Sequence, residues 1–233
     1  MIELRRANDR FHTAIDWLDS RHSFSFGSHY DPNDQGHGLL IVNNDDRVRA
    51  GTGFQTHPHR DMEIVTWVLD GSLEHKDTTG HQGILYPGLA QRMTAGSGIW
   101  HSEMNPSGAE EVHFVQMWVL PDTESVEPGY QQLDINGELD RGGLVPIASG
   151  KGHDAAISIR QSGAVLWGGR LKPAETVAVP DARHVHVFLA RGTAALEGAG
   201  PLDEGDAARL TAVGSPELTA GPDGAEVLIW ATD

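Results

Sequence analysis

The sequence contains no cysteine, which excludes disulfide bonds, thiolate metal ligands and cysteine nucleophiles together. Any transition metal must therefore be held by nitrogen and oxygen atoms. The chain also lacks a run of about 18 apolar residues and a basic N-terminal segment followed by an apolar one, so we expect neither a membrane span nor a signal peptide. The cytoplasm is the expected compartment.

Basic residues are scarce. Lys and Arg number 17 against 33 Asp and Glu, which gives a formal net charge of −16. Such a charge repels phosphate backbones and anionic membrane surfaces. We therefore expect no direct binding to nucleic acid or to a membrane, whereas a protein partner stays possible. The oligomeric state leaves no readable trace, and a monomer is the default expectation.

Sustained helical periodicity is nearly absent, while glycine (28) and proline (12) are frequent. Short apolar runs stand between turn residues at 38–42, 64–69, 113–119, 185–189 and 227–230. This pattern is typical of a sandwich or barrel built from many short strands. Strands buried on both faces read as continuous apolar runs, as in a rolled sheet with a filled interior. The sequence therefore predicts an all-β fold, with a barrel favoured over an open sheet.

The length of 233 residues favours two domains. Turn signals with little apolar periodicity over 121–143 indicate a crossover between them. A weak internal repeat supports two similar halves, because the stretch 67–73 is echoed by 187–194. We expect an N-terminal domain over 1–130 and a C-terminal domain over 131–233.

Residues with metal-ligand chemistry concentrate between positions 51 and 105. His57 and His59 are two residues apart, and so are His101 and Glu103. In an extended chain, residues two apart point to one side of a sheet. Two such pairs facing each other would form a four-ligand site. Glu63 is a second candidate for the carboxylate, and the spacing leaves this choice open.

Two glycine-framed motifs carry these residues. The first cupin signature is matched, apart from one additional residue before the last glycine, by Gly51, His57, His59, Glu63 and Gly71. The second is matched by Gly98, His101 and Asn105, with Gly96 where many cupins have proline. The sequence thus resembles the cupin superfamily. Three imidazoles and a carboxylate suit Fe(II), Mn(II), Co(II), Ni(II), Cu(II) or Zn(II). Four ligands around an octahedral ion leave two positions open, which is typical of a catalytic site.

The resemblance narrows to the pirin family over about residues 20–120. The stretches that carry it are 22–27 (HSFSFG), 43–46 (NNDD), 53–63 (GFQTHPHRDME) and 93–103 (MTAGSGIWHSE). The C-terminal half is similar in pattern and length only. The resemblance implies a bicupin, two stacked cupin β-barrels with one divalent metal in the N-terminal barrel, Fe(II) being the first expectation. It implies as metal ligands His57, His59, His101 and Glu103. Glu63 would then hydrogen-bond a ligand or the loop.

Pirins have been described as quercetin 2,3-dioxygenases and, in other lineages, as regulators of partner proteins. The resemblance therefore implies a metal-dependent dioxygenase that opens the central ring of a flavonol such as quercetin and releases carbon monoxide. Its partners would be a small planar aromatic substrate and dioxygen. The metal would bind the deprotonated 3-hydroxyl, and Glu103 would act as the catalytic base.

Two alternatives stay open. One is a non-enzymatic metal-binding regulator that acts through a protein partner. The other is a different cupin reaction, such as isomerisation or hydrolysis, in which Arg60 would anchor an anionic substrate. An open channel to the metal is expected for the oxygenase and is unnecessary for the regulator.

Other aromatic residues, one methionine and the remaining histidines can also be assigned roles from the sequence. Phe54, Trp100 and Met117 are candidates for packing against a planar substrate. His75 and His113 are interpreted as structural residues of the same barrel. The pair at 184 and 186 echoes the first pair, but no later histidine could complete a second site, so we expect no metal there. The remaining histidines are interpreted as solvated, namely His12, His22, His29, His37, His81 and His153.

Overall fold

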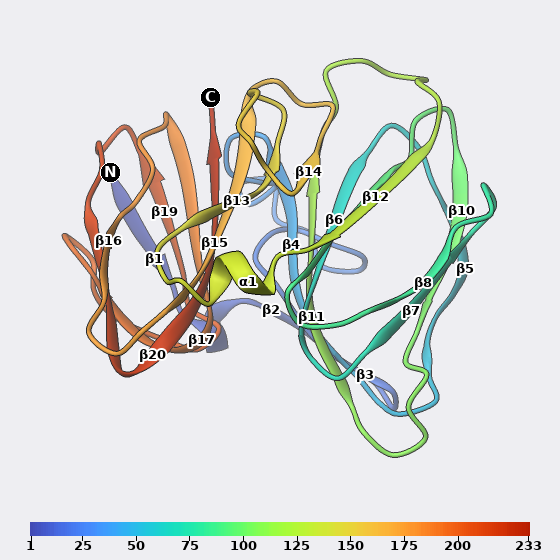
Figure 1. Ribbon diagram of the computed structural model, residues 1–233, viewed down its shortest axis with the longest axis horizontal. Helices are drawn as coiled ribbons and strands as arrows, with labels where there is room; N and C mark the ends of the chain where they lie inside the picture. Colours follow the sequence, from blue (N-terminus) through green and yellow to red (C-terminus); the bar gives the residue numbers. More distant parts are fainter.

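The computed structural model describes residues 1–233 and places nearly all regular structure in β-strands, which confirms the all-β prediction. Helix is limited to the short α1 (Asn136–Leu139) and the 3-10 turn η1 (Ala7–Asp9). Two β-barrels lie side by side, one coloured blue to green and the other orange to red (Figure 1). None of the helices is long and apolar enough to cross a lipid bilayer.

The N-terminal barrel consists of two facing sheets. The larger one has seven strands in the order β12 (Gly129–Asp134), β9 (Leu89–Thr94), β6 (Glu63–Asp70), β11 (Val112–Val119), β4 (Leu40–Val48), β3 (Leu18–His22) and β2 (Phe11–Ala14). The smaller one has four, in the order β5 (Gly53–His59), β10 (Ile99–Met104), β7 (Leu73–Asp77) and β8 (Gln82–Leu85). Since successive side chains alternate between the faces of a strand, every second residue points between the two sheets.

The C-terminal barrel is formed by one nine-stranded sheet. Its main path is β1 (Ile2–Arg5), β19 (Ala207–Thr211), β17 (His184–Leu196), β20 (Glu217–Thr232), β15 (Ala164–Leu171), β13 (Val145–Ser149) and β14 (Ile157–Ser158). Off this path, β16 (Thr176–Ala178) pairs with β20, and β18 (Gly200–Asp203) pairs with β17. The interior is an apolar cluster of 15 buried residues, among them Val187, Leu210 and Ile229. This barrel is filled by its own side chains.

Four of the five apolar runs lie within a strand, in chain order β6, β11, β17 and β20, and the first, at 38–42, ends in β4, which begins at Leu40. Strand β17 has 13 residues and β20 has 16, so both extend well beyond the apolar runs that predicted them. Register shifts between Leu189 and Arg191 and between Gly192 and Ala194 interrupt their pairing. Such bulges bend a strand and let it continue around a barrel.

The two barrels share the largest hydrophobic cluster of the molecule. This cluster of 22 buried residues includes Trp67 and Met117 from the first barrel and Phe188 and Trp230 from the second. The indole Nε1 of Trp67 also donates a hydrogen bond to Glu226 Oε1 at 2.8 Å. The barrels therefore meet over a packed apolar interface.

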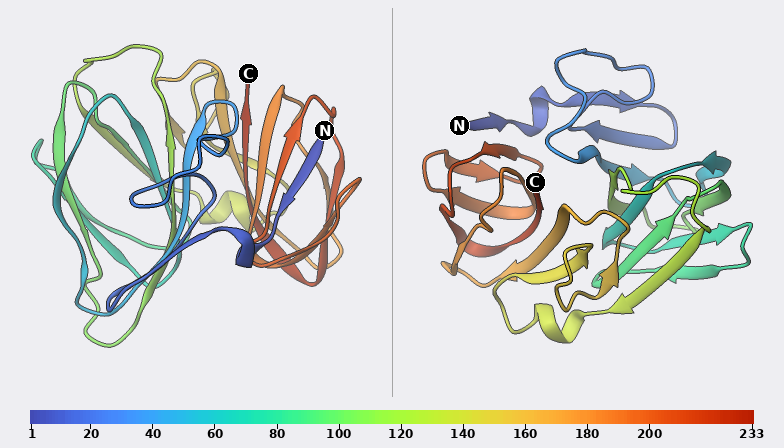
Figure 2. Two further views of the ribbon diagram at one scale, coloured as in Figure 1. Left: turned by 180° about the vertical axis from the view of Figure 1, so that it is seen from behind. Right: turned by 90° about the horizontal axis from the view of Figure 1, so that it is seen from above.

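The chain passes from one barrel to the other twice, once after β1 and once after β12. Strand β1 pairs with β19 of the C-terminal barrel, with Ile2 opposite Leu210. The chain then runs to the N-terminal barrel, as the view from above shows (Figure 2). Strand β12 pairs with β9 of the N-terminal barrel. The division at residue 130 stays a prediction.

The second pair of spaced histidines lies on β17 and points out of its barrel. Val185 and Val187 belong to the interior of the C-terminal barrel. His186 takes the opposite face, where its ring lies 5.6 Å from that of Phe24. The His184 ring lies 5.3 Å from that of His37. Both histidines thus face residues of the N-terminal half.

Candidate metal centre

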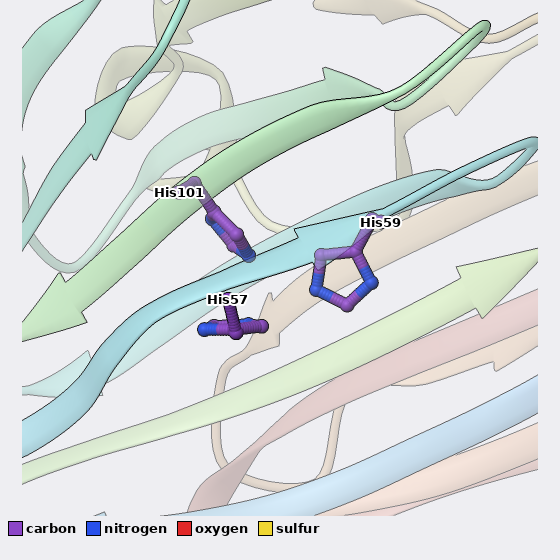
Figure 3. Close-up of side chains that lie close together, drawn as sticks. All are labelled: His57, His59 and His101. Atoms are coloured by element: carbon purple, nitrogen blue, oxygen red, sulfur yellow. The ribbon is translucent and has the colours of Figure 1, made fainter.

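Three histidines converge inside the N-terminal barrel from two paired strands (Figure 3). His57 and His59 lie on β5, and His101 lies on β10 directly opposite His57. Their candidate ligand atoms all lie within 4.8 Å of one another. The spacing of two residues on β5 puts both side chains on the inner face, as the sequence predicted.

A tight turn sets the approach of β10. Gly96 has a φ of +48°, and a Cβ built on it would lie 2.1 Å from the carbonyl oxygen of Val126. Only glycine fits at this position, because the left-handed conformation and the close backbone approach both exclude a side chain. The turn leads directly into the strand that carries His101.

The ring nitrogens are arranged for a metal. His57 Nδ1 lies 2.7 Å from the Gln55 carbonyl and donates to it, which leaves Nε2 free. His59 Nε2 and both ring nitrogens of His101 are buried without a hydrogen-bond partner. Unpaired buried polar atoms of this kind carry a free-energy penalty of about 1–3 kcal/mol each. A divalent ion bound to His59 Nε2 and to one ring nitrogen of His101 would remove the penalty at those two atoms, so the residues fit a metal.

Electrostatics keep the imidazoles in the form that binds metal. Burial, reinforced by the neighbouring imidazoles, lowers the pKa of His59 to about 4 and that of His101 to about 3. Both rings are therefore neutral at pH 7. Neutral imidazole is the form that coordinates a metal ion.

Glu103 lies two residues beyond His101 and is buried. Gln116 on β11 donates from Nε2 to both carboxylate oxygens, at 2.9 and 2.7 Å. Thr66 Oγ1 lies 3.4 Å from Oε1. Although the register of β5 and β10 shifts between His101 and Glu103, Glu103 lines the same cavity as His57 and His59.

Glu63 is buried on β6 and has a different set of partners. Thr94 Oγ1 donates to its Oε2 at 3.0 Å, and the backbone N–H of Arg160 donates to the same oxygen at 3.1 Å. Burial raises the pKa of its carboxyl, and these hydrogen bonds oppose the shift. Glu63 thus holds the loop between β14 and β15.

A cavity of about 670 Å³ opens from the histidines to the surface. Its volume is in the range of pockets that hold small organic ligands. Part of its wall is aromatic and is formed by Trp17, Phe26, Phe54 and Trp118. The ring of Trp118 meets that of His59 edge to face, with centroids 4.9 Å apart. The cavity therefore joins the metal site to an apolar surface suited to a planar ring.

Of the three candidates for packing against a substrate, one lines the cavity and two do not. Phe54 lines the cavity, as predicted. Trp100 is 51% exposed and lines a separate pocket on the outer rim. Met117 is fully buried in the interface between the barrels, because it takes the face of β11 opposite to Gln116 and Trp118. Trp118 was not predicted to line the cavity. The signal that could have found it is its position two residues after Gln116, on the same face of β11.

A polar part of the cavity wall was also missed. It is formed on β3 and β4 by Ser20, His22, Asn44 and Asp46. The prediction that His22 is solvated was wrong, because this residue is buried and its Nδ1 lies 2.9 Å from Asn44 Oδ1. The sequence did contain a signal: the two residues on each strand are two positions apart, so they point to the same face.

The two histidines that were interpreted as structural residues of this barrel pair with carboxylates. His75 is fully buried, with Nε2 3.1 Å from Asp77 Oδ2 and its ring centroid 5.3 Å from that of His101. His113 Nε2 lies 2.6 Å from Asp45 Oδ1. These contacts agree with a structural role. Arg60 is exposed and lies 3.3 Å from Asp61.

Comparison with protein-family models gives two matches along the chain. Residues 4–119 match the model described as Pirin. Residues 146–230 match the model described as Quercetinase C-terminal cupin domain. The matches fall on the two barrels and agree with a bicupin.

Similar proteins cover almost the whole chain. A Mycobacterium tuberculosis strain H37Rv protein, Rv0181c, is 57% identical over 230 residues, covering 98% of this chain and 94% of the relative, and is provisionally named a quercetin 2,3-dioxygenase. The Escherichia coli K12 protein named quercetin 2,3-dioxygenase is 39% identical over 199 residues, covering 85% of each chain.

Solved structures show the same fold. The crystal structure of YhhW from Escherichia coli superposes with a TM-score of 0.92 at 35% identity, covering 100% of this chain and 98% of that one. A second YhhW structure, described as a bacterial pirin in complex with nickel(II), gives a TM-score of 0.90, with 99% and 98% covered.

Proposed function

Because this chain belongs to the pirin family, we propose that it is a metal-dependent quercetin 2,3-dioxygenase, which opens the central ring of a flavonol with dioxygen and releases carbon monoxide. The observation that carries this proposal is the cavity of about 670 Å³ that joins the histidines to an aromatic wall. A purely regulatory metal site has no need of such a chamber. The names of the Mycobacterium and Escherichia relatives support the same reaction.

The proposed ligands are His57, His59, His101 and Glu103. Held by these residues, a divalent ion would supply Lewis-acid chemistry that lowers the pKa of the flavonol 3-hydroxyl. We favour Fe(II), although the nickel(II) complex of YhhW shows that a relative also accepts another ion. Glu63 is a less suitable fourth ligand, because it does not line the cavity that Glu103 shares with His57 and His59.

Glu103 is the proposed base. Its carboxylate lines the cavity and accepts the proton of the 3-hydroxyl at a free lone pair. Gln116 limits the motion of this carboxylate by donating to both of its oxygens. The indole N–H of Trp118 in turn donates to Gln116 Oε1 at 3.3 Å and fixes the amide. The aromatic wall excludes water and orients the planar substrate for attack.

The test is oxygen uptake with quercetin by protein loaded separately with Fe(II), Mn(II), Co(II) and Ni(II). We expect uptake with at least one metal, matched by release of carbon monoxide, and its loss in His101→Ala together with the metal. His184→Ala, a truncation outside the cavity, is the matched control and should keep both. Metal-loaded protein that consumes no oxygen with any ion would overturn the proposal and favour the regulatory alternative. The cytoplasmic location and the monomeric state stay predictions.

A further inference from the structure

A strip of hydrogen-bonding side chains lines the cavity on the side opposite to the histidines. The histidines lie on β5 and β10 of the smaller sheet, whereas the strip lies on β3 and β4 of the larger sheet. The strip consists of Ser20, His22, Asn44 and Asp46. A ligand held at the metal by one end therefore extends toward the strip with its other end.

The strip is a built arrangement with fixed donors and acceptors. Ser20 Oγ donates to Asp46 Oδ1. His22 Nδ1 donates to Asn44 Oδ1 at 2.9 Å, and Thr13 Oγ1 lies 3.0 Å from His22 Nε2. Burial lowers the pKa of His22, so its ring is neutral and keeps this donor and acceptor pattern. The side chains are thus held in place before a ligand arrives.

Two polar groups of the strip are left for a ligand. Asn44 is satisfied at Oδ1, which leaves its Nδ2 amide without a partner in the protein. Asp46 is satisfied at Oδ1, which leaves Oδ2 without one. Both residues are only 3% exposed, yet both line the cavity. A ligand that displaces solvent from these two atoms must supply a hydrogen-bond partner to each.

We propose that Asn44 and Asp46 determine substrate specificity by binding hydroxyl groups on an outer ring of the flavonol, and so select polyhydroxylated flavonols over unsubstituted ones. This inference rests on the proposed function, because it takes the flavonol as the ligand. Asn44 and Asp46 are two residues apart on one strand, so they present two adjacent polar groups on the same face. The amide donates to a hydroxyl oxygen, and the carboxyl group accepts a hydroxyl proton.

The electrostatic state of Asp46 supports this role. Burial raises its pKa to about 7, and the nearby Asp45 and Glu103 carboxylates add to the shift, while the hydrogen bond from Ser20 opposes it. Near neutral pH the carboxyl group is therefore available in both the protonated and the ionised form. It can donate to or accept from a phenolic hydroxyl.

The test compares quercetin with 3-hydroxyflavone, which keeps the 3-hydroxyl but has no hydroxyl on either outer ring. With the metal-loaded enzyme we expect kcat/KM to be at least about tenfold higher for quercetin. In Asn44→Ala and Asp46→Ala this ratio should fall toward one, mainly through a higher KM for quercetin. Asp46→Asn, which keeps the size of the side chain, should retain part of the ratio.

Asn43→Ala is the matched control. Asn43 is also a buried asparagine of β4, but its Nδ2 bonds Ser23 Oγ rather than lining the cavity. If loss of stability alone caused the fall in the kcat/KM ratio, Asn43→Ala would lower the ratio as much as Asn44→Ala does. We expect Asn43→Ala to keep the wild-type ratio. An unchanged ratio in both Asn44→Ala and Asp46→Ala overturns the proposal.

A measurement of flavonol binding distinguishes failure of the specificity proposal from failure of the proposed dioxygenase function. Should the wild-type enzyme turn over neither compound, the dioxygenase proposal fails, and quenching of tryptophan fluorescence by the two flavonols still gives their dissociation constants. A preference of about tenfold for quercetin that disappears in Asn44→Ala and Asp46→Ala would support the strip as a hydroxyl-binding surface. Equal binding of the two compounds by the wild type would overturn it.

Discussion

The two barrels use similar strands to enclose opposite kinds of interior. In the N-terminal barrel, inward positions carry His57, Glu103 and Asp46, and the space between the sheets stays open as a cavity. In the C-terminal barrel, inward positions carry residues such as Val187 and Ile229, which fill the interior. The difference shows that one scaffold serves as a site or as a core according to which side chains take the inner face.

The two His-X-His pairs show how the side chains that face the interior differ between the barrels. His57 and His59 occupy inward positions on β5, whereas His184 and His186 occupy outward positions on β17. A shift of one residue along a strand moves a whole set of side chains to the other face. The sequence pattern His-X-His is therefore common to both barrels, and only its register with the interior differs.

The largest effect is expected from substitution of the carboxylate that acts at the metal centre of the N-terminal barrel. Glu103→Gln should lower kcat/KM for quercetin by about 10²–10⁴-fold, because it removes the proposed base and an anionic ligand. Glu63→Gln should keep turnover within a few-fold while lowering the free energy of unfolding. Steady-state oxygen uptake and denaturant titration measure the two effects, and an exchange of the two phenotypes would assign the site to Glu63.

A second prediction tests the filled barrel as a source of stability. Ile229→Ala leaves a cavity in the C-terminal core, so it should lower the free energy of unfolding by about 2–5 kcal/mol. The metal content of the folded protein should stay unchanged. The matched truncation Leu133→Ala removes a side chain that is 51% exposed and should change stability by only about 0.5 kcal/mol. Loss of metal from folded Ile229→Ala would show that the two interiors are coupled.

A third prediction concerns the acid inside the open barrel. The pKa of Asp46 is raised from 3.8 to about 7 in the folded chain, so between these values the folded state binds more protons than the unfolded state. Stability from this group is present below about pH 4 and is lost as the pH rises through about 7. Asp46→Asn removes the titration. Its stability relative to wild type should therefore increase from pH 5 to pH 8 by on the order of 1–4 kcal/mol.

Urea titrations of both proteins without metal, at each pH, measure this difference. A constant difference across the range would mean that Asp46 does not titrate there. The interior of the C-terminal barrel is apolar, so a pH-dependent difference of this sign would be specific to the open barrel.

The smallest expected effect tests the outward histidine pair. His184→Ala should leave the number of metal ions per chain unchanged, because the ring lies against His37 and outside the cavity. His57→Ala should lose the metal. Elemental analysis of both variants after identical loading measures this. Loss of metal from His184→Ala would break the contrast between the barrels.

Sequence reasoning predicted the two-barrel architecture and the three histidines, because both leave local signals. Strands appear as apolar runs, and ligand pairs appear as residues two apart. The choice between Glu63 and Glu103 stays a prediction. The partners that distinguish the two carboxylates belong to other segments of the fold: Gln116 on β11 for Glu103, and Arg160 in the loop between β14 and β15 for Glu63.

The polar strip could not be assigned for a similar reason. Its members come from β3 and β4, and only the pairing of β4 with β11 brings Asn44 opposite Gln116 and so near the metal centre. The sequence left open whether Met117 packs in the core or against a substrate, because an apolar residue next to the cavity-lining Gln116 gives no sign of which face it takes. Sequence alone identifies the alternation of a strand but not which of its faces is the inner one.

The pairing of β1 with β19 has a consequence for the order in which the molecule is built. The terminal ammonium group of Met1 donates to the Thr211 carbonyl at 2.8 Å across 210 positions of the chain. During synthesis β1 therefore has no partner until β19, far later in the chain, has been made. Closing so long a loop carries a large entropic penalty and is slow. Strand β1 is therefore made early but reaches its place late.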